Sequence, residues 1–426
     1  MQVKHYLTIM SALLCLALSC NEKPDDGGKG SKDTANAPDE AAVGEVLPPW
    51  AEGWLDIHAI STGRGECTFF IMPDGTSMVI DAGEVVTSTT SPVSVTQRPN
   101  SDTRAYFTQA KYMKHFLEAT GHDYLDYAVM SHFHIDHFGT PKGKGFIVSS
   151  EGYTQTGMMA IYTTLPYKKL LDRAWSADDS EYDFIDKSAS NYSTGTVGDY
   201  TEFVKYATTK KGLVMERFSA GTDEQLTLQY NKVKYPTFKI FNWAVNGEYW
   251  NGTTMIDAYG SAIPAENGTS CISLISYGKF DYYTAGDAGG NTKMANPVAK
   301  AIGRPIEAMK ADHHMSVNCM TPTQMGILKP KVIVTQSFAR RTDQPMLETV
   351  EALLNGTYYN TGVSLYFTNI DPVISTPNAN LYDKTHYNGH VVIRVAPGGD
   401  RFWVFQLDDT NNLYKVKSVE GPFECE

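Results

Sequence analysis

One short segment constrains this chain more than any other: Ser131-His132-Phe133-His134-Ile135-Asp136-His137-Phe138-Gly139. It places three histidines and one aspartate within six positions, in a chain of 426 residues that has 11 histidines. The apolar run 127–130 before it predicts a buried strand, so the segment is expected to be a loop at a strand end. Alternate side chains of such a loop point the same way, which lets His132 and His134 share one metal ion. Asp136 and His137 would then turn towards a second ion, and these donors suit Zn²⁺, Mn²⁺ or Fe.

Three further candidates for this site lie elsewhere in the chain. Asp287 ends a turn rich in small residues, which leaves its carboxylate exposed. The pair His313-His314 stands at an expected strand end, and adjacent residues of an extended chain point in opposite directions, so only one of the two is expected to bind a metal. Asp81 follows the run 77–80 and either orients a metal-binding histidine or makes a turn hydrogen bond.

Strand-like and helix-like patterns alternate along the body, which indicates a mixed α and β fold. Helices are expected near 105–117, 198–208, 292–302 and 345–354. Strands are expected at 54–60, 68–72, 77–80, 127–130, 238–243, 271–276, 280–284, 331–335 and 391–395. The stretch 140–265 shows no clear pattern, and we interpret it as an insertion over the site.

The N-terminus predicts export and lipid anchoring. Residues 6–18 form an apolar run that is too short to span a bilayer and has the length of a signal-peptide core. The run ends in a sequence that resembles a bacterial lipobox, so Cys20 is expected to carry lipid; an ordinary signal peptide cleaved near Ser19 is the alternative. Residues 21–48 are rich in Gly, Asp, Pro and Lys, which is typical of a flexible linker. We therefore expect a signal peptide at 1–20, a linker at 21–48 and a folded body at 49–426, anchored at the periplasmic face or the surface of a bacterial cell.

Taken together, the metal-site motifs resemble those of the metallo-β-lactamase-fold hydrolases. The His-x-His-x-Asp-His motif follows a strand, Ile80-Asp81-Ala82-Gly83 lies upstream of it, and Gly286-Asp287 lies downstream. Within that superfamily the chain is most similar to the hydrolase domain of ComEC-type competence proteins, over residues 56–83, 266–289, 309–316 and 329–354. The resemblance implies a four-layer αββα sandwich with the metals at one edge.

The resemblance also implies a role for each candidate residue, with two divalent ions, Zn or Mn, as cofactors. His132 and His134 would bind the first ion, and Asp136 and His137 the second. Asp287 would bridge both ions. His313, rather than His314, would be the last ligand of the second ion.

Three departures from the pattern of these relatives stand out. No histidine occurs between His137 and His313, so the third histidine that many members use for the first ion is missing. Met315 replaces the glycine that follows the histidine pair. Gln344 stands where relatives often carry a histidine near the substrate.

These features predict a lipid-anchored hydrolase outside the cytoplasm that cleaves phosphodiester bonds with a metal-held hydroxide. Asp136 would hold this nucleophile and accept its proton, and Lys310 would contact the substrate or support the site. The net charge of −12 argues against long nucleic acids, so a small molecule or a cell-envelope phosphodiester is the expected substrate. Two alternatives remain open: a lactonase or β-lactamase on the same scaffold, and a surface binding lipoprotein whose metal site has decayed.

Overall fold

The computed structural model describes residues 41–63, 65–85, 98–99, 105–140, 147–176, 194–290, 292–337, 340–359 and 362–426. All of them belong to the compact unit Asn36–Glu426, and the fold below is that of this unit. The predicted signal peptide, Cys20 and residues 21–40 of the predicted linker lie outside the described residues.

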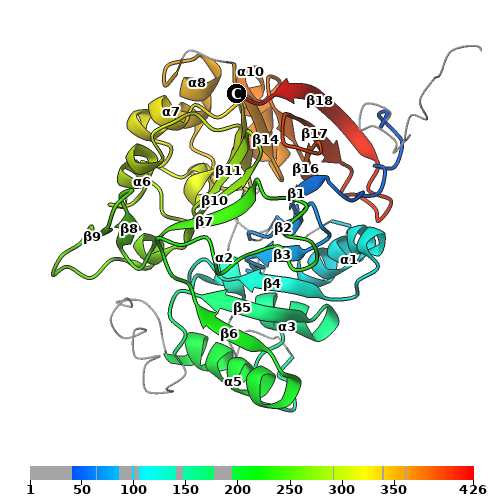
Figure 1. Ribbon diagram of the computed structural model, residues 1–426. Helices are drawn as coiled ribbons and strands as arrows, with labels where there is room; N and C mark the ends of the chain where they lie inside the picture. The colour runs from blue at the N-terminus through cyan, green and yellow to red at the C-terminus, as the bar shows by residue number, and fades with distance from the viewer. Residues whose placement is uncertain are drawn as a thin grey trace, which may run out of the picture. The chain divides into compact units, whose positions relative to one another are not determined.

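Two nine-stranded sheets form the framework (Figure 1). The first has the order β18-β17-β16-β1-β2-β3-β4-β5-β6 and the second the order β15-β14-β13-β12-β11-β10-β7-β8-β9. The strands of the first sheet are β1 (Leu55–Ala59), β2 (Thr68–Ile71), β3 (Ser77–Ile80), β4 (Leu125–Val129), β5 (Tyr167–Asp172), β6 (Val214–Arg217), β16 (His390–Val395), β17 (Arg401–Leu407) and β18 (Val416–Glu424). Those of the second are β7 (Phe238–Val245), β8 (Glu248–Trp250), β9 (Met255–Asp257), β10 (Ile272–Tyr277), β11 (Phe280–Thr284), β12 (Ala308–Lys310), β13 (Val332–Thr335), β14 (Ser364–Phe367) and β15 (His386–Tyr387).

Each sheet contains a run of parallel strands, and these runs decide where the site can lie. The strands β3 to β6 are parallel in the first sheet, and β11 to β15 are parallel in the second. Ile80 at the end of β3 is paired with Val129 at the end of β4. The loops that follow parallel strands therefore leave from the same edge of each sheet, which is the usual place of a site in such sheets.

A hydrophobic core fills the space between the two sheets. It joins side chains of the first sheet, such as Phe70 and Tyr127, to side chains of the second, such as Tyr282 and Val334. The rings of Phe70 and Tyr282 meet edge to face, with their centroids 6.1 Å apart. Burying a side chain of this size contributes about 2–3 kcal/mol, so this layer supplies much of the stability.

Helices cover the outer face of each sheet (Figure 1). On the first sheet lie α1 (Ala105–Leu117), α3 (Gly157–Thr164) and α5 (Thr194–Lys211). On the second lie α6 (Ala295–Ile302), α7 (Pro322–Leu328), α8 (Leu347–Leu354), α9 (Pro372–Ser375) and α10 (Ala379–Tyr382). The prediction of a mixed α and β chain is confirmed, with two large sheets between two helical layers.

The predicted insertion at 140–265 is not confirmed. This stretch supplies β5 and β6 to the first sheet, β7 to β9 to the second, and the covering helices α3 and α5. The strands β6, β8 and β9 lie at or next to a sheet edge and are mostly exposed or half-buried, so they lack the apolar alternation by which a strand is recognised in sequence.

The described end of the predicted linker, residues 41–48, contacts the first sheet. The Gly44 amide donates to the Val416 carbonyl at 2.8 Å, and Leu47 is buried. Within the described ranges, no helix has both the length and the apolar composition that a membrane crossing requires.

Candidate functional site

Four loops meet where the parallel strands end. The turn 81–83 follows β3, and the segment 130–134 follows β4 and leads into the short helix α2 (Ile135–Phe138). The turn 285–289 follows β11, and the 3₁₀ turn η5 (Asp312–Met315) comes two residues after the end of β12. The sequence candidates that are far apart along the chain are therefore brought together at one edge.

The Asp287 carboxylate is the centre of this cluster. Its Oδ2 atom lies 3.7 Å from His132 Nε2 and 3.6 Å from His313 Nε2. Its Oδ1 atom lies 3.3 Å from His137 Nε2 and 3.7 Å from His314 Nε2. Each carboxylate oxygen thus faces two imidazole nitrogens, one from each of two loops.

Two more predicted residues extend the cluster. His134 Nδ1 lies 2.8 Å from His132 Nε2. On the other side, Asp136 Oδ2 lies 3.2 Å from His314 Nε2 and 3.8 Å from His137 Nε2. We divide these side chains into two donor groups by the part of the cluster that they face: a first group of His132, His134 and His313, and a second group of Asp136, His137 and His314. The atoms close enough together to hold one ion are those of Asp287 with His132 and His134 on one side, and those of Asp287 with His137, His314 and Glu66 on the other.

Hydrogen bonds on the far side of two rings fix which nitrogen faces Asp287. His137 Nδ1 lies 2.9 Å from Asp81 Oδ2, and Asp81 also accepts a 2.7 Å hydrogen bond from the Ser131 amide. His314 Nδ1 lies 2.7 Å from the Gln336 carbonyl oxygen. With Nδ1 donating in both rings, Nε2 is the nitrogen turned towards Asp287, and it is the one that would give up its proton to bind a metal. The hydrogen bond that Asp81 makes is the one expected of a residue that orients a histidine.

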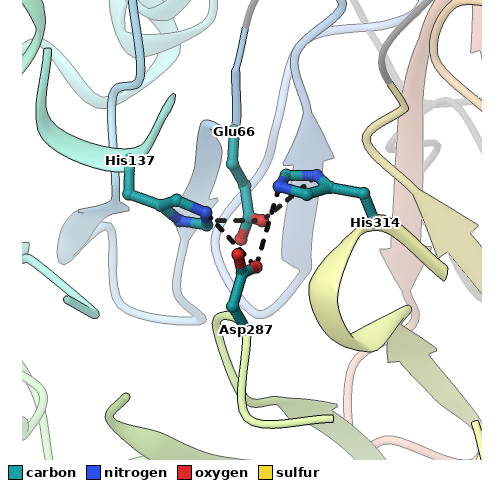
Figure 2. A group of neighbouring side chains, drawn as sticks. All are labelled: Glu66, His137, Asp287 and His314. Atoms are coloured by element: carbon teal, nitrogen blue, oxygen red, sulfur yellow. Dashed lines mark ion pairs between the residues drawn. The ribbon is translucent and has the colours of Figure 1, made fainter. Parts of the chain in front are cut away.

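Glu66 is a buried acid of the site that the sequence reasoning missed. Figure 2 shows its carboxylate and that of Asp287 between the imidazoles of His137 and His314. Glu66 Oε2 lies 3.9 Å from His137 Nδ1, 4.0 Å from His314 Nδ1 and 3.1 Å from Lys310 Nζ. The only sign of this role in the sequence is that an acid directly precedes the apolar run 67–72, where a buried carboxylate is costly unless it has a partner.

Lys310 lies underneath the site and does not face a substrate. Its ammonium group is 3.1 Å from Glu66 Oε2 and donates to the Gly286 and Ala311 carbonyl oxygens at 2.7 and 2.9 Å. Its side chain is 1% exposed. Of its two expected roles, contact with the substrate or support of the site, this buried position fits support, because Lys310 binds the loops that carry Asp287 and the histidine pair.

The charges of the site reinforce one another. Burial lowers the pKa of His137, but four carboxylates outweigh this effect and raise it: Asp287, Asp136, Glu66 and Asp81. Burial raises the pKa of Asp287 and of Asp136, but the neighbouring imidazoles, above all that of His137, outweigh burial and lower both. Both aspartates are therefore ionised at neutral pH, as metal ligands must be.

The histidine pair does not have the expected extended backbone. His313 (φ 45°, ψ 49°), His314 (φ 52°, ψ 27°) and Met315 (φ 59°) are three consecutive residues in the left-handed region. Each such residue costs about 1–2 kcal/mol unless it is glycine. We expected only one of the two to bind a metal because an extended backbone would point the rings apart; the left-handed turn instead brings both rings to Asp287.

These donors fit a metal centre. His137 Nε2 and Asp287 Oδ1 are buried and have no hydrogen-bond partner among the described residues, which is costly unless another group satisfies them. Imidazole nitrogens combined with carboxylate oxygens suit Zn²⁺, Mn²⁺ and Fe. The side chains of Asp136 and His313 are 18% and 17% exposed, so the cluster is open to solvent on their side.

A scan against protein-family models gives no match, and a search of the curated proteins gives none either. Among solved structures, the chain is similar to a protein of Parabacteroides distasonis assigned as a metal-dependent hydrolase, with 14% identity, a TM-score of 0.34, and 73% of this chain and 92% of that chain covered. It is similar to CmlA, a diiron β-hydroxylase of Streptomyces venezuelae (12% identity, TM-score 0.37, 82% and 55% covered). It is also similar to a diphosphatase of the PhnP family (10% identity, TM-score 0.31, 80% and 98% covered). A shared function does not follow from values this low, so the donor geometry must support any function.

Proposed function

We propose that this chain is a metal-dependent hydrolase of the metallo-β-lactamase fold that uses two divalent ions, Zn or Mn. One observation carries the proposal: the two oxygens of the buried Asp287 carboxylate each face two imidazole nitrogens at 3.3–3.7 Å. A carboxylate that divides its oxygens between two sets of donors is suited to bridge a pair of ions. The two helical layers around two sheets, and the sequence motifs, agree with this fold.

The ions would supply a polarised water and charge stabilisation, and the residues of the chain would do the rest. Asp136 is the member of the second donor group with an exposed edge, and its lowered pKa keeps it ionised at neutral pH. An ionised carboxylate at the open side can hold the attacking water and accept its proton. Asp81 and the Gln336 carbonyl keep the rings of His137 and His314 in one orientation, so the donors need little reorganisation when the reaction occurs.

We propose phosphodiesters as the substrate class, in the form of a small molecule or a cell-envelope component. In-line displacement at phosphorus suits a pair of ions that clamps the attacking and the leaving oxygen. The resemblance of the motifs to ComEC-type hydrolase domains favours the same class. The net charge of −12 disfavours a long nucleic acid, because polyanions bind through many basic residues.

The test is hydrolysis of bis(p-nitrophenyl) phosphate by the full-length chain after addition of Mn²⁺ or Zn²⁺. We expect metal-dependent turnover that is lost in Asp136→Asn, while the metal content of the protein is measured in the same samples. Asp281→Asn is the control, because Asp281 is a buried aspartate of β11 that pairs with Arg304 and not with a residue of the site. Turnover of esters or lactones without turnover of the phosphodiester would show that the substrate class is a different one. Protein that binds no metal would refute the proposal.

We further propose that the protein is anchored in the bacterial cell envelope through lipid on Cys20. The support is the lipobox-like sequence that ends at Cys20 and the polar segment after it. Labelling of cells with radioactive palmitate should mark the wild-type protein and leave Cys20→Ala unlabelled. Equal labelling of both proteins, or of neither, would refute the anchor.

A further inference from the structure

The first donor group needs a histidine from outside the loop that carries His132 and His134. Two of its three members, His132 and His134, come from one loop, and the chain has no histidine between His137 and His313. Histidines outside the cluster are engaged elsewhere: His390 Nδ1 accepts from the Ser61 amide, and His386 pairs with Glu420. Among the described residues, a further imidazole for this group has to come from the histidine pair.

The distances divide the pair between the two groups. His313 Nε2 lies 3.6 Å from Asp287 Oδ2, the oxygen that His132 faces. His314 Nε2 lies 3.7 Å from Asp287 Oδ1 and 3.2 Å from Asp136 Oδ2, which belong to the second group. Two ligands of one tetrahedral ion, each at about 2.0–2.2 Å, lie roughly 3.3 Å apart, so both sets of contacts are close to ligand spacing.

The backbone and the neighbours of His313 keep its ring in this position. In an extended chain, adjacent side chains point to opposite sides. Here the consecutive left-handed residues turn both rings towards one carboxylate from different directions. Behind the ring of His313, the Cys319 sulfur lies 3.8 Å from Nδ1, while Nε2 faces Asp287 and also lies 3.4 Å from Asn267 Nδ2.

We infer that His313 is a ligand of the first ion, in place of the histidine that the intervening chain lacks, and that His314 is the ligand of the second. Two neighbouring residues would then serve two different ions. This inference rests on the proposed metal-dependent function and corrects the expectation that His313 completes the second ion. With His313, the first ion would have three imidazoles and the shared Asp287 carboxylate as ligands.

Two single-site backgrounds test the division. Asp136→Asn weakens the second donor group and His134→Gln weakens the first. Neither substitution replaces His313 or His314. We expect His313→Gln to remove the remaining equivalent of metal from the Asp136→Asn protein and to leave the remaining equivalent in the His134→Gln protein. His314→Gln, the matched control one residue away, should do the reverse. The readouts are metal equivalents per chain after gel filtration and the visible absorption of the Co²⁺-loaded protein, with circular dichroism to confirm folding.

The expected loss of affinity at the affected ion is more than about 100-fold, because even groups that only support a ligand change affinity by 10–100-fold. If His313→Gln acts in the His134→Gln background, or removes both ions everywhere, or removes neither, the division of the pair is refuted while the hydrolase proposal stands. If wild-type protein binds no metal, the proposed function itself fails, and the inference fails with it.

Discussion

The two loops that carry the histidines reach the same carboxylate in different ways. In the loop 131–139, His134 has an ordinary extended backbone (φ −85°, ψ 147°), and the short helix α2 begins directly after it. In the loop 311–316, three consecutive residues are left-handed. A regular backbone leaves a periodic spacing in the sequence, whereas a left-handed turn leaves none. The first loop could therefore be recognised from residue spacing, and the second was assigned the wrong backbone.

The loops also differ in what holds them. Main-chain hydrogen bonds hold both loops: the Asp136 carbonyl accepts from the Glu66 amide in the first, and the His313 amide donates to the Gly286 carbonyl in the second. In the first loop, buried acids also bind main-chain amides: Glu266 Oε1 accepts from the Phe133 amide at 2.6 Å, and Asp81 accepts from the Ser131 amide at 2.7 Å. Side-chain substitutions should therefore loosen the first loop, and changes in backbone preference should affect the second.

The largest effect is expected where the two loops meet, at Asp287. Asp287→Asn removes the one carboxylate among the described residues that faces both donor groups, and it should lower phosphodiester turnover by about 10³–10⁴-fold, or about 4–5.5 kcal/mol. Both ions should be lost together, which metal analysis of the same protein would show. Asp281→Asn should keep both ions. An Asp287→Asn protein that retains one tightly bound ion would show that the two donor groups are independent.

The second prediction tests the support of the first loop. Glu266 forms a buried ion pair with Arg173, with Nη2–Oε2 at 2.6 Å, besides its bond to the Phe133 amide. Glu266→Ala removes one partner of a buried charge pair, and we expect it to lower the free energy of unfolding by about 3–5 kcal/mol. Urea denaturation followed by circular dichroism measures this change. A loss below about 1 kcal/mol, the size expected for a surface ion pair, would show that this acid does not hold the loop.

The same contrast explains what the sequence could predict. Strands such as β1, β3 and β11 and the helix α1 have clear apolar patterns, and they appear where they were expected. Edge strands such as β6 and β9 are mostly exposed, so no pattern marked them. The candidates of the first loop, with Asp287, were found from residue type and spacing. Glu66 and the division of the histidine pair were not, because both depend on which buried groups the fold places opposite one another.

A third prediction concerns His390, a buried histidine outside the two loops, and its effect on how stability depends on pH. Burial lowers the pKa of His390 to about 4 in the folded protein, whereas an unfolded chain has a value near 6.5. Between pH 6.5 and pH 4 the unfolded state therefore binds more protons than the folded state, so stability is full above pH 6.5 and falls as the pH falls. The loss that His390 causes should reach about 3 kcal/mol near pH 4.

Urea denaturation of wild type and His390→Gln, at pH values from 7 to 4.5, measures this contribution. Glutamine can still accept the hydrogen bond from the Ser61 amide but does not titrate. The wild-type protein should therefore lose more stability on acidification than the variant. Parallel curves for the two proteins would show that this histidine is not the source of the pH dependence.

The smallest expected effect concerns the strain in the second loop. Asparagine adopts left-handed backbone angles at lower cost than most residues, and the His313 side chain is 17% exposed. In the presence of a chelator, His313→Asn should therefore raise the free energy of unfolding by about 1 kcal/mol, although the same change removes a proposed ligand. His134→Asn is the control, because His134 has an ordinary φ of −85° and gains nothing from asparagine. Equal stability changes in the two variants would mean that the left-handed turn is not strained, and the protein would then carry no energetic cost for directing two neighbouring histidines at one carboxylate.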